Sequence, residues 1–339
     1  MTIVLACDGV LEQYSCHRFA DDWRRQGRRC LVVGPQLLGH QPLPCRNCDV
    51  TLRPTELLGS TVLEQASAIG LFLHNPDEIE AIANGYKNYR KSQGLKSVPV
   101  FSGPLIPLMG DGLVDAFLKR FSCDLIIVSG NQQIAQLRSI TTHWPTNWRI
   151  PKILATGFWF PREASASQAN QPLLVALIQD NIPTYLGAKQ RLLQLLERWA
   201  TDQPGWTVVL QRDQSWAVDE TIASNKGNSP VNIIEAAPEQ MLRLLGRCTA
   251  CLSVSSPWSL VAMMWRRIPL VIGDYGIQAE QQTTNFFGCG TMHRLRDIKG
   301  LNAVHNLPLV NEGWLDNMGG AIKDGSNRLL ALLDTWKNK

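Results

Sequence analysis

Short apolar runs alternate with amphipathic stretches along almost the whole chain. The first half contains apolar runs of strand length at 3–7, 30–34, 69–73, 98–102, 124–129 and 152–156. Stretches with helical periodicity lie between several of these runs, at 14–26, 77–91, 113–121 and 132–140. Strands that alternate with helices pair in parallel, because each helix returns the chain to the start of the next strand. The first half therefore predicts a doubly wound parallel sheet with helices on both faces.

A second alternating series follows residues 161–172, PREASASQANQP, whose small and polar residues are typical of a linker. Its strand-length runs lie at 173–178, 206–211, 231–236, 250–254 and 269–273, with helical patterns at 185–201, 238–247 and 318–336. A chain of 339 residues is long for a single core. We therefore expect two α/β, Rossmann-like domains, 1–160 and 172–317. A C-terminal helix within 318–339 could pack back on the N-terminal domain.

The composition is that of an ordinary globular protein, with 45% apolar residues, 18% charged residues and a formal net charge of +4. No dense Lys/Arg tract is present, so a nucleic-acid partner is not expected. The run 3–7 is too short for a secretory signal, and no apolar run approaches the roughly 18 residues of a membrane span. Nine scattered cysteines fit a reducing compartment. The expectation is a cytoplasmic protein, with peripheral membrane contact left open.

Residues 251–277 carry the strongest signal for a ligand site. A strand-length run ends at Val254, and Ser255, Ser256 and Pro257 follow it, where Ser256 is the expected N-cap of a helix that Pro257 opens. The unpaired N–H groups of such a helix end can hold an anion such as a nucleotide phosphate. The same pattern also fits a well-capped helix without a ligand, which we expect to end at Arg266-Arg267.

Ligands of open α/β sheets collect at the carboxyl ends of the strands, so residues that follow a strand are the functional candidates. In the first domain these are Asp8, Gly9, His74, Gly103 and Pro104. Asp8 could act as a general base toward an acceptor hydroxyl, and His74 could do the same closer to its ordinary pKa. The alternatives are a turn hydrogen bond for Asp8 and a helix cap for His74. His17, inside a predicted helix, is either structural, on the surface or directed toward the site.

In the second domain the candidates for binding a donor are Gln179, Asn181, Arg212, Glu235, Ser255, Ser256, Asp274, Tyr275 and Gly276. Arg212 could pair with a phosphate or with its neighbour Asp213. Glu235 could accept a hydrogen bond from a ribose or a base, or lie exposed in a loop. Gly276 could mark a backbone conformation that only glycine adopts easily, or a close approach to a ligand.

Several common motifs are absent from the sequence, and their absence narrows the function. No G-x-G-x-x-G follows a strand, and G-x-x-x-x-G-K-[ST], H-E-x-x-H and Asp-x-Asp do not occur. Dehydrogenase and P-loop chemistry are therefore not expected. The chain also lacks an obvious motif for binding a diphosphate through a bridging metal ion. The pairs Cys45–Cys48, near His40, and Cys248–Cys251 would need further ligands to hold zinc, and the second pair fits apolar packing better. We expect no metal.

The segments SVSSPWSL and IPLVIGDYGI resemble the donor-side signature of GT-B glycosyltransferases. From about residue 2 to 290 the chain is similar to a bacterial family of uncharacterised proteins described as putative glycosyltransferases. The matching positions are Asp8, Gly103-Pro104, Gln179, Pro183, Ser255-Ser256 and Asp274-Tyr275-Gly276. The resemblance implies a GT-B-like fold of two Rossmann-like domains facing across a cleft. It also implies an acceptor mainly on the first domain, a nucleotide sugar on the second, and transfer without a metal.

One departure from the GT-B pattern affects the donor. Many of these enzymes carry Glu-x4-Gly-x-Pro after the phosphate turn, where this chain has Ala262 and Arg267 before Pro269. The nucleotide and the stereochemical course are therefore open, with a lean toward a CMP-sugar. We expect a glycosyltransferase that uses a nucleotide sugar, no other cofactor, and a surface-polysaccharide or glycolipid acceptor. The alternatives are a non-catalytic GT-B-like binding protein and, less favoured, a sugar-nucleotide epimerase.

Overall fold

The computed structural model describes residues 2–37, 46–159, 164, 169–213, 232–237 and 240–336, without the side chains of residues 212 and 213. It divides into two compact units. The described residues of unit 1 are 2–37, 46–159 and 316–336, and those of unit 2 are 164, 169–213, 232–237 and 240–315. Each unit is built around its own parallel sheet. This confirms the predicted class of two doubly wound α/β domains.

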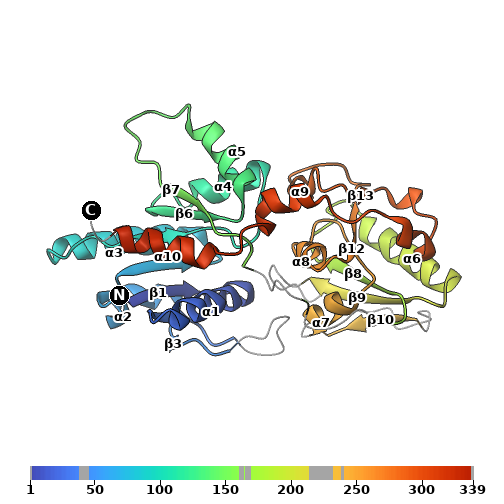
Figure 1. Ribbon diagram of the computed structural model, residues 1–339, viewed down its shortest axis with the longest axis horizontal. Helices are drawn as coiled ribbons and strands as arrows, with labels where there is room; N and C mark the ends of the chain where they lie inside the picture. Colours follow the sequence, from blue (N-terminus) through green and yellow to red (C-terminus); the bar gives the residue numbers. More distant parts are fainter. Residues whose placement is uncertain are drawn as a thin grey trace. The chain divides into compact units, whose positions relative to one another are not determined.

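The sheet of unit 1 has seven strands in the order β3-β2-β1-β4-β5-β6-β7. Figure 1 labels β1, β3, β6 and β7 of this sheet. They are β1 (Thr2–Cys7), β2 (Arg29–Gly34), β3 (Val50–Thr51), β4 (Ala68–Phe72), β5 (Val100–Ser102), β6 (Leu125–Val128) and β7 (Lys152–Ala155). The central strand β1 is buried along its whole length, with Ile3 level with Cys30 on one side and with Ala68 on the other. Such continuous apolar strands are typical of a parallel sheet that helices cover on both faces.

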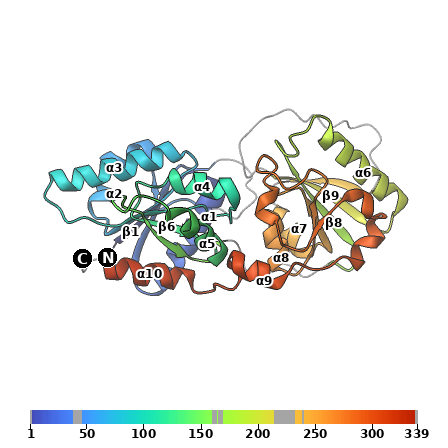
Figure 2. The ribbon, with the colours of Figure 1, turned by 90° about the horizontal axis from the view of Figure 1, so that it is seen from above.

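The helices of unit 1 are α1 (Val10–Arg25), α2 (Thr61–Glu64), α3 (Pro76–Ser92), α4 (Gly110–Leu118), α5 (Asn131–Thr141) and α10 (Gly325–Trp336), with a 3₁₀ turn η1 (Pro54–Gly59). Helix α3 begins where the sequence favours it, because the Asn75 side chain accepts a hydrogen bond from the Asp77 N–H at 3.0 Å and Pro76 opens the first turn. Figure 2 shows α3 and α10 on opposite faces of the sheet.

The last helix, α10, packs on unit 1, where it lies beside α1. The Trp23 indole Nε1 donates to the Ser326 carbonyl at 2.9 Å, and Arg28 pairs with Asp334 at 2.6 Å. Leu329 and Leu333 are fully buried in the core that β1 and α1 share. The end of the chain thus completes the face of the sheet that carries α1.

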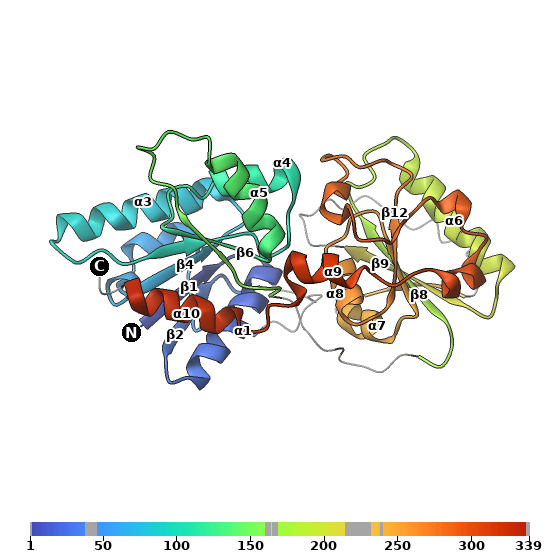
Figure 3. The same cartoon turned by 45° about the horizontal axis from the view of Figure 1, so that its top comes forward.

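The sheet of unit 2 has the order β10-β9-β8-β11-β12-β13. Figure 3 shows β8, β9 and β12 of this sheet together with helix α6. Its strands are β8 (Leu173–Gln179), β9 (Thr207–Asp213), β10 (Ile233–Ala236), β11 (Ala250–Ser253), β12 (Ile268–Ile272) and β13 (Met292–His293). The helices are α6 (Ala188–Asp202), α7 (Met241–Arg247), α8 (Trp258–Met264) and α9 (Glu312–Leu315), with 3₁₀ turns η3 (Thr283–Phe286), η4 (Leu295–Asp297) and η5 (Leu301–Asn306). Helix α6 buries Leu192, Leu196 and Trp199, which recur at helical spacing.

Several predicted helices differ in their bounds from those observed, and three of the differences have a clear local cause. The helix expected over 14–26 already begins at Val10, because polar residues in its first turn hid the apolar pattern. The helix expected to reach Arg266-Arg267 ends at Met264, since Arg266 takes the left-handed conformation with φ 57°. The pattern over 318–336 is two elements, a π-helical turn Asp316–Gly320 and α10, separated because Gly319 has φ 130°.

No helix among the described residues has both the length and the apolar character that a bilayer span requires.

Candidate functional site

Each sheet reverses its strand order at one place, and this is where open α/β sheets bind ligands. In unit 1 the reversal lies between β1 and β4, and in unit 2 it lies between β8 and β11. In open α/β sheets the loops after neighbouring strands diverge to opposite faces at such a point, and the space between them is the crevice that ligands enter. The residues at the switch point of each unit are therefore candidates for a ligand site.

Asp8 and His74 meet at the switch point of unit 1. Asp8 follows β1, and its carboxylate oxygens accept the backbone N–H of His74, which follows β4, at 2.9 and 3.1 Å. Burial raises the pKa of Asp8 above its ordinary value, against the opposing effect of the His74 N–H. The side chain of His74 is exposed. The structure thus shows His74 orienting Asp8 through its main chain, while a catalytic role for either residue stays a prediction.

Glu12 is a second carboxylate in this crevice, and the sequence reasoning missed it. It lies in the first turn of α1 and folds back over Gly9, where a Cβ atom would be only 2.1 Å from Glu12 Oε2. Burial raises the pKa of Glu12 to about 7, and the negative charge of Asp8 adds to the rise. Its own backbone N–H and the Arg120 charge oppose the rise. Its place four residues after Asp8 in a strand-to-helix turn was the available signal.

Arg120 supplies positive charge near Glu12. Its Nε donates to the Ser102 hydroxyl at 3.1 Å, and its Nη1 donates to the Ala116 carbonyl at 2.9 Å. The Ser102 hydroxyl in turn donates to the Leu71 carbonyl of β4. These bonds hold the guanidinium near the ends of β4 and β5. Burial lowers the pKa of Arg120. The crevice of unit 1 combines two carboxylates of raised pKa with one desolvated cation, and such a set is suited to proton transfer.

The other predicted acceptor-side residues have packing reasons of their own. A Cβ on Gly103 would lie 2.0 Å from the Ile127 carbonyl oxygen, so only glycine allows β5 and β6 to end this close together. Pro104 is partly buried after it. His17 is 6% exposed inside α1, and its Nδ1 accepts from Arg46 Nε at 3.0 Å. These contacts favour the structural alternative for His17, and none of them tests an acceptor role for the three residues.

Zinc has no evident site in the described part of the chain. No group of three or more His, Cys, Asp or Glu side chains there could hold a metal ion. Of the first cysteine pair, Cys45 lies outside the described residues, and Cys48 accepts a hydrogen bond from Gln13 Nε2 at 2.8 Å. In the second pair, Cys248 and Cys251 are both buried, as small apolar side chains usually are.

Gln179 and Ser255 close the switch point of unit 2. Gln179 ends β8, is 7% exposed, and accepts the backbone N–H of Ser255 at 3.1 Å and its hydroxyl at 3.4 Å. Ser256 is fully buried, and its hydroxyl accepts from the Trp258 N–H at 3.3 Å. The residue at the N-cap of α8 is Pro257 and not Ser256 as predicted, because the first turn starts one residue later. Phosphate binding at this turn stays a prediction.

The loops after β8 and β12 are tied together beside this crevice. Gln281 accepts from the Thr184 N–H at 3.2 Å, and the Tyr185 hydroxyl donates to Gln278 Oε1 at 2.9 Å. The rings of Tyr185 and Tyr275 lie 6.0 Å apart. Predicted residue Asn181 is exposed in the first of these loops. The two loops thus form a single wall with aromatic and amide groups.

The segment Asp274-Tyr275-Gly276 has a defined conformation. Asp274 Oδ2 accepts from the Leu295 N–H at 2.7 Å, and burial raises the pKa of Tyr275. Gly276 has φ 76°, a left-handed conformation that favours glycine and accounts for this residue without a ligand. Asp274 and Tyr275 also line a cavity of about 600 Å³ between α6 and residues 295–300. Four cations line the same cavity and were not among the predicted residues: Arg191, Arg198, Arg296 and Lys299.

For two predicted donor-binding residues, the structure gives less support for a place at the switch point. Glu235 is exposed and lies near the carboxyl end of β10, level with Leu210, so it belongs to the strand and not to a loop. The backbone of Arg212 belongs to β9, and its side chain lies outside the described residues, as does that of its alternative partner Asp213.

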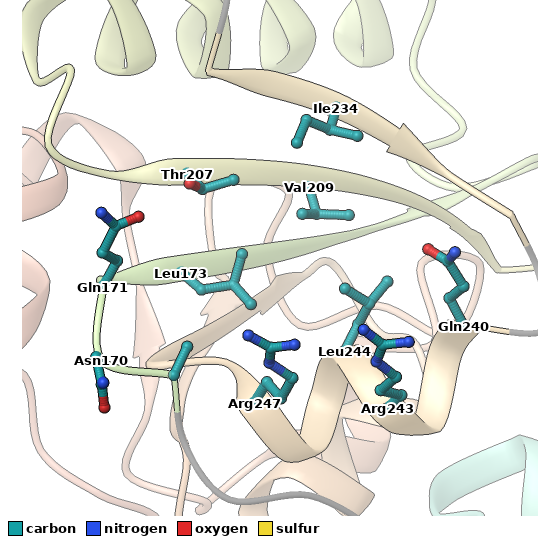
Figure 4. Close-up of a pocket in the computed structure, with 11 residues that line it drawn as sticks. Asn170, Gln171, Leu173, Thr207, Val209, Ile234, Gln240, Arg243, Leu244 and Arg247 are labelled. Atoms are coloured by element: carbon teal, nitrogen blue, oxygen red, sulfur yellow. The ribbon is translucent and has the colours of Figure 1, made fainter.

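A second cavity of unit 2 lies away from this crevice. It has a volume of about 550 Å³ and lies beside α7, near the amino ends of β8 and β9 (Figure 4). Arg243 and Arg247 line it together with Leu173 and Val209. Since Gln179 is at the opposite end of β8, this cavity is separate from the switch point.

Comparisons with known proteins agree with the observed architecture. A family model described as "Putative glycosyltransferase (DUF6716)" matches residues 80–320. A comparison with curated protein sequences gives no match.

Three similar solved structures show the fold that the chain adopts. UDP-GlcNAc 2-epimerase from Methanocaldococcus jannaschii has a TM-score of 0.64 at 12% identity, over 98% of this chain and 99% of that chain. The enzyme of that name from Neisseria meningitidis, bound to UDP-GlcNAc, has a TM-score of 0.62 at 12% identity, over 99% and 100%. The glycotransferase of kitacinnamycin has a TM-score of 0.53 at 10% identity, over 98% of each chain. These similarities confirm the GT-B-like fold.

Proposed function

The chain belongs to the family described as "Putative glycosyltransferase (DUF6716)", and we propose that it transfers a sugar from a nucleotide sugar to an acceptor hydroxyl without a metal ion. The acceptor that we propose is a surface polysaccharide or a glycolipid. The observation that carries this proposal is the pair of carboxylates at the switch point of unit 1, Asp8 and Glu12, both with raised pKa values. Transfer to a hydroxyl needs a group that removes its proton, and such a pair is suited to that step.

Unit 1 supplies the base in this proposal. Asp8 is oriented by the His74 N–H, and Glu12 is half ionised near neutral pH. A base of pKa about 7 is present as the carboxylate and still binds the proton strongly enough to assist its departure. The proton passes from the acceptor hydroxyl to this pair while the hydroxyl oxygen bonds to the anomeric carbon of the sugar. The bond from that carbon to the phosphate oxygen of the nucleotide breaks, and the nucleotide leaves with the electron pair. The His74 imidazole is the alternative base.

Unit 2 holds the donor in this proposal. The Oε1 atom of Gln179 is occupied by Ser255, so a nucleotide that reaches this carboxamide meets its NH₂ donors. The Ser255-Ser256 turn lies at the same end of the sheet and would bind the departing phosphate, with Arg212 assisting. Asn181, Glu235 and the segment 274–276 complete the proposed donor site. Among nucleotide sugars we favour a CMP-sugar as the donor, because the helix after the turn has Ala262 where many GT-B enzymes have a glutamate.

The first experiment is a thermal-shift panel with CMP, UDP, GDP and dTDP, followed by hydrolysis assays with sugar conjugates of any nucleotide that stabilises the protein. Stabilisation by one nucleotide together with turnover of its sugar conjugate supports the transferase. If none of the four nucleotides stabilises the protein, the result favours the non-catalytic binding protein. A nucleotide that binds without any turnover, with or without a glycan acceptor, also contradicts the enzyme.

The same carboxylate pair also suits an epimerase, because removal of a proton from a sugar carbon needs a base and an acid close together. This second candidate is tested by incubating the sugar nucleotide in deuterated water. An epimerase that abstracts a C–H proton incorporates deuterium into the recovered sugar, whereas a transferase leaves the carbon-bound hydrogens unchanged.

A further inference from the structure

A cluster of apolar side chains lies on unit 1 at the edge of the sheet opposite Asp8. The cluster, here called the Trp patch, consists of Leu118, Phe121, Trp144, Trp148 and Ile150. Residues 119–124 lead into β6 and residues 142–151 lead into β7, so the patch is at the amino edge of the parallel strands. In Figure 1 the second of these segments is the green loop that runs from α5 to β7.

The aromatic rings of the Trp patch support one another and are anchored in the core. Trp144 lies 5.8 Å from the buried ring of Phe117, 5.7 Å from Phe121 and 5.5 Å from Trp148. Phe121 and Trp148 are 6.1 Å apart. A hydrogen bond of 3.0 Å from the Trp148 N–H to the Pro145 carbonyl holds the loop in a turn. The exposed ring of Trp148 is therefore held in place by its contacts with Trp144 and Phe121.

The outer members of the patch are open to solvent. Trp148 is 51% exposed, Leu118 is 48% exposed and Ile150 is 36% exposed. Large apolar side chains that gather on a surface mark a site of interaction. Tryptophan in particular combines an apolar ring system with a polar N–H, which suits the boundary between lipid headgroups and hydrocarbon.

The charge around the patch is positive. No Asp or Glu occurs from residue 125 to residue 162, whereas Arg138, Arg149 and Lys152 do. Asp124, just before this stretch, has a side chain only 4% exposed and is held by Lys87 at 3.0 Å and by Arg149 at 3.1 Å. Asp115, one helical turn before Leu118, pairs with Lys119 at 2.7 Å. The Arg149 side chain, between Trp148 and Ile150 in the sequence, remains 83% exposed and gives the patch a positive charge.

We propose that the Trp patch docks unit 1 on a membrane surface rich in anionic phospholipid. The exposed Trp148 and Ile150 side chains enter the headgroup region, and the surrounding cations bind lipid phosphates. A nucleic acid fits less well, because it would leave the aliphatic side chains Leu118 and Ile150 uncovered. A protein partner would need to bring acidic groups to match Arg138 and Arg149, which an anionic lipid surface supplies everywhere.

The test is co-sedimentation of the full chain with phosphatidylcholine vesicles and with vesicles that also contain phosphatidylglycerol. The wild type should bind the anionic vesicles more strongly, and binding should weaken with added salt, which screens the charges. The double variant Trp148→Ser/Ile150→Ser should lose on the order of tenfold or more in partitioning, since less apolar area is buried. Arg149→Gln should lose about fivefold.

Two control variants match these changes at sites away from the patch. Leu309→Ser removes an apolar side chain of unit 2 that is 50% exposed, and Lys323→Gln removes an exposed cation of unit 1. Both should bind vesicles as the wild type does. The proposal is overturned if the wild type does not bind anionic vesicles. It is also overturned if the double variant binds them as strongly as the wild type while circular dichroism shows that it is folded.

Capture of a protein or a nucleic acid through Trp148, with no vesicle binding, would likewise overturn the lipid assignment. The readout is vesicle binding and not sugar transfer. The proposed function can therefore fail without affecting this result, and the reverse also holds.

Discussion

The two units close their switch points in the same way but with different chemistry. In unit 1 the Asp8 carboxylate accepts the backbone N–H of His74, and in unit 2 the Gln179 carboxamide accepts the backbone N–H of Ser255. Each bond joins the ends of two paired strands at the point where the strand order of the sheet reverses. The group that accepts this bond is thus an ionisable carboxylate in unit 1 and a neutral carboxamide in unit 2.

The surroundings of the two bonds extend this contrast. Asp8 has a second carboxylate, Glu12, beside it, and burial raises the pKa of both. Gln179 instead contacts the backbone N–H and hydroxyl of the buried Ser255, which stay neutral. A neutral amide and hydroxyl groups can bind a ligand but exchange no proton at ordinary pH. The comparison therefore assigns proton transfer to unit 1 and donor binding to unit 2 within the proposed transferase.

The largest effect should come from Asp8→Asn. The asparagine oxygen can still accept the His74 N–H, so the fold is kept while the charge is lost. Transfer should fall by roughly 10²–10⁴-fold, the contribution of a general base, and the nucleotide-induced thermal shift should stay unchanged. The matched control is Asp111→Asn, at an exposed position of unit 1. Unchanged turnover in Asp8→Asn would remove Asp8 from the mechanism.

Gln179→Ala tests the other half of the comparison. It leaves the buried N–H and hydroxyl of Ser255 without their partner, at a cost of about 1–3 kcal/mol. The variant also loses the carboxamide NH₂ that we propose binds the nucleotide, so nucleotide affinity should fall on the order of tenfold, and the pH dependence of transfer should not move. Titration calorimetry measures the affinity, with the exposed Gln194→Ala of α6 as the control. A variant that binds nucleotide normally would contradict a donor site at this switch point.

Glu12→Gln should change stability in a pH-dependent way. The folded chain raises the pKa of Glu12 from 4.5 to about 7, so between these values it binds more protons than the unfolded chain and loses stability as the pH rises. The glutamine variant lacks this loss. It should gain on the order of 1–2 kcal/mol over the wild type above pH 7, and little below pH 4.5.

Urea unfolding at several pH values measures the difference, and the exposed Glu80→Gln serves as the control. A constant difference between Glu12→Gln and the wild type at all pH values would show that Glu12 is not desolvated.

The smallest effect should come from Gly9→Ala. Its methyl group would lie 2.1 Å from Glu12 Oε2, at the end of a flexible side chain, so the carboxylate can swing toward solvent without breaking the fold. The pKa of Glu12 should then fall below about 7, toward its ordinary value. Gly112→Ala is the control, because a Cβ there meets nothing within 4 Å. An NMR titration of the labelled Glu12 carboxyl that gives equal pKa values in all three proteins would contradict this geometry.

The fold was predictable from the sequence because both sheets are built of continuous apolar strands. The strands β3 and β13 were missed, since two residues each are too short to form a pattern. The positions of Asp8 and His74 at one edge followed from their places after strands, as did those of Gln179 and Ser255. Their functional roles remain predictions.

Glu12 and Arg120 could not be recognised as parts of one site from the sequence. They belong to different βα segments and come together only when β1 and β5 take their places in the sheet. The raised pKa of Glu12 depends on burial and on the charge of Asp8, which no local pattern records.

The pH dependence of transfer by the wild type and by Glu12→Gln tests the central assignment most directly. With saturating donor, the wild-type rate should rise with pH through a midpoint near 7, where the Glu12 carboxyl loses its proton. This midpoint should be absent from the Glu12→Gln profile while the nucleotide affinity stays the same. An unchanged midpoint in the variant would contradict the assignment of proton transfer to the Asp8–Glu12 pair.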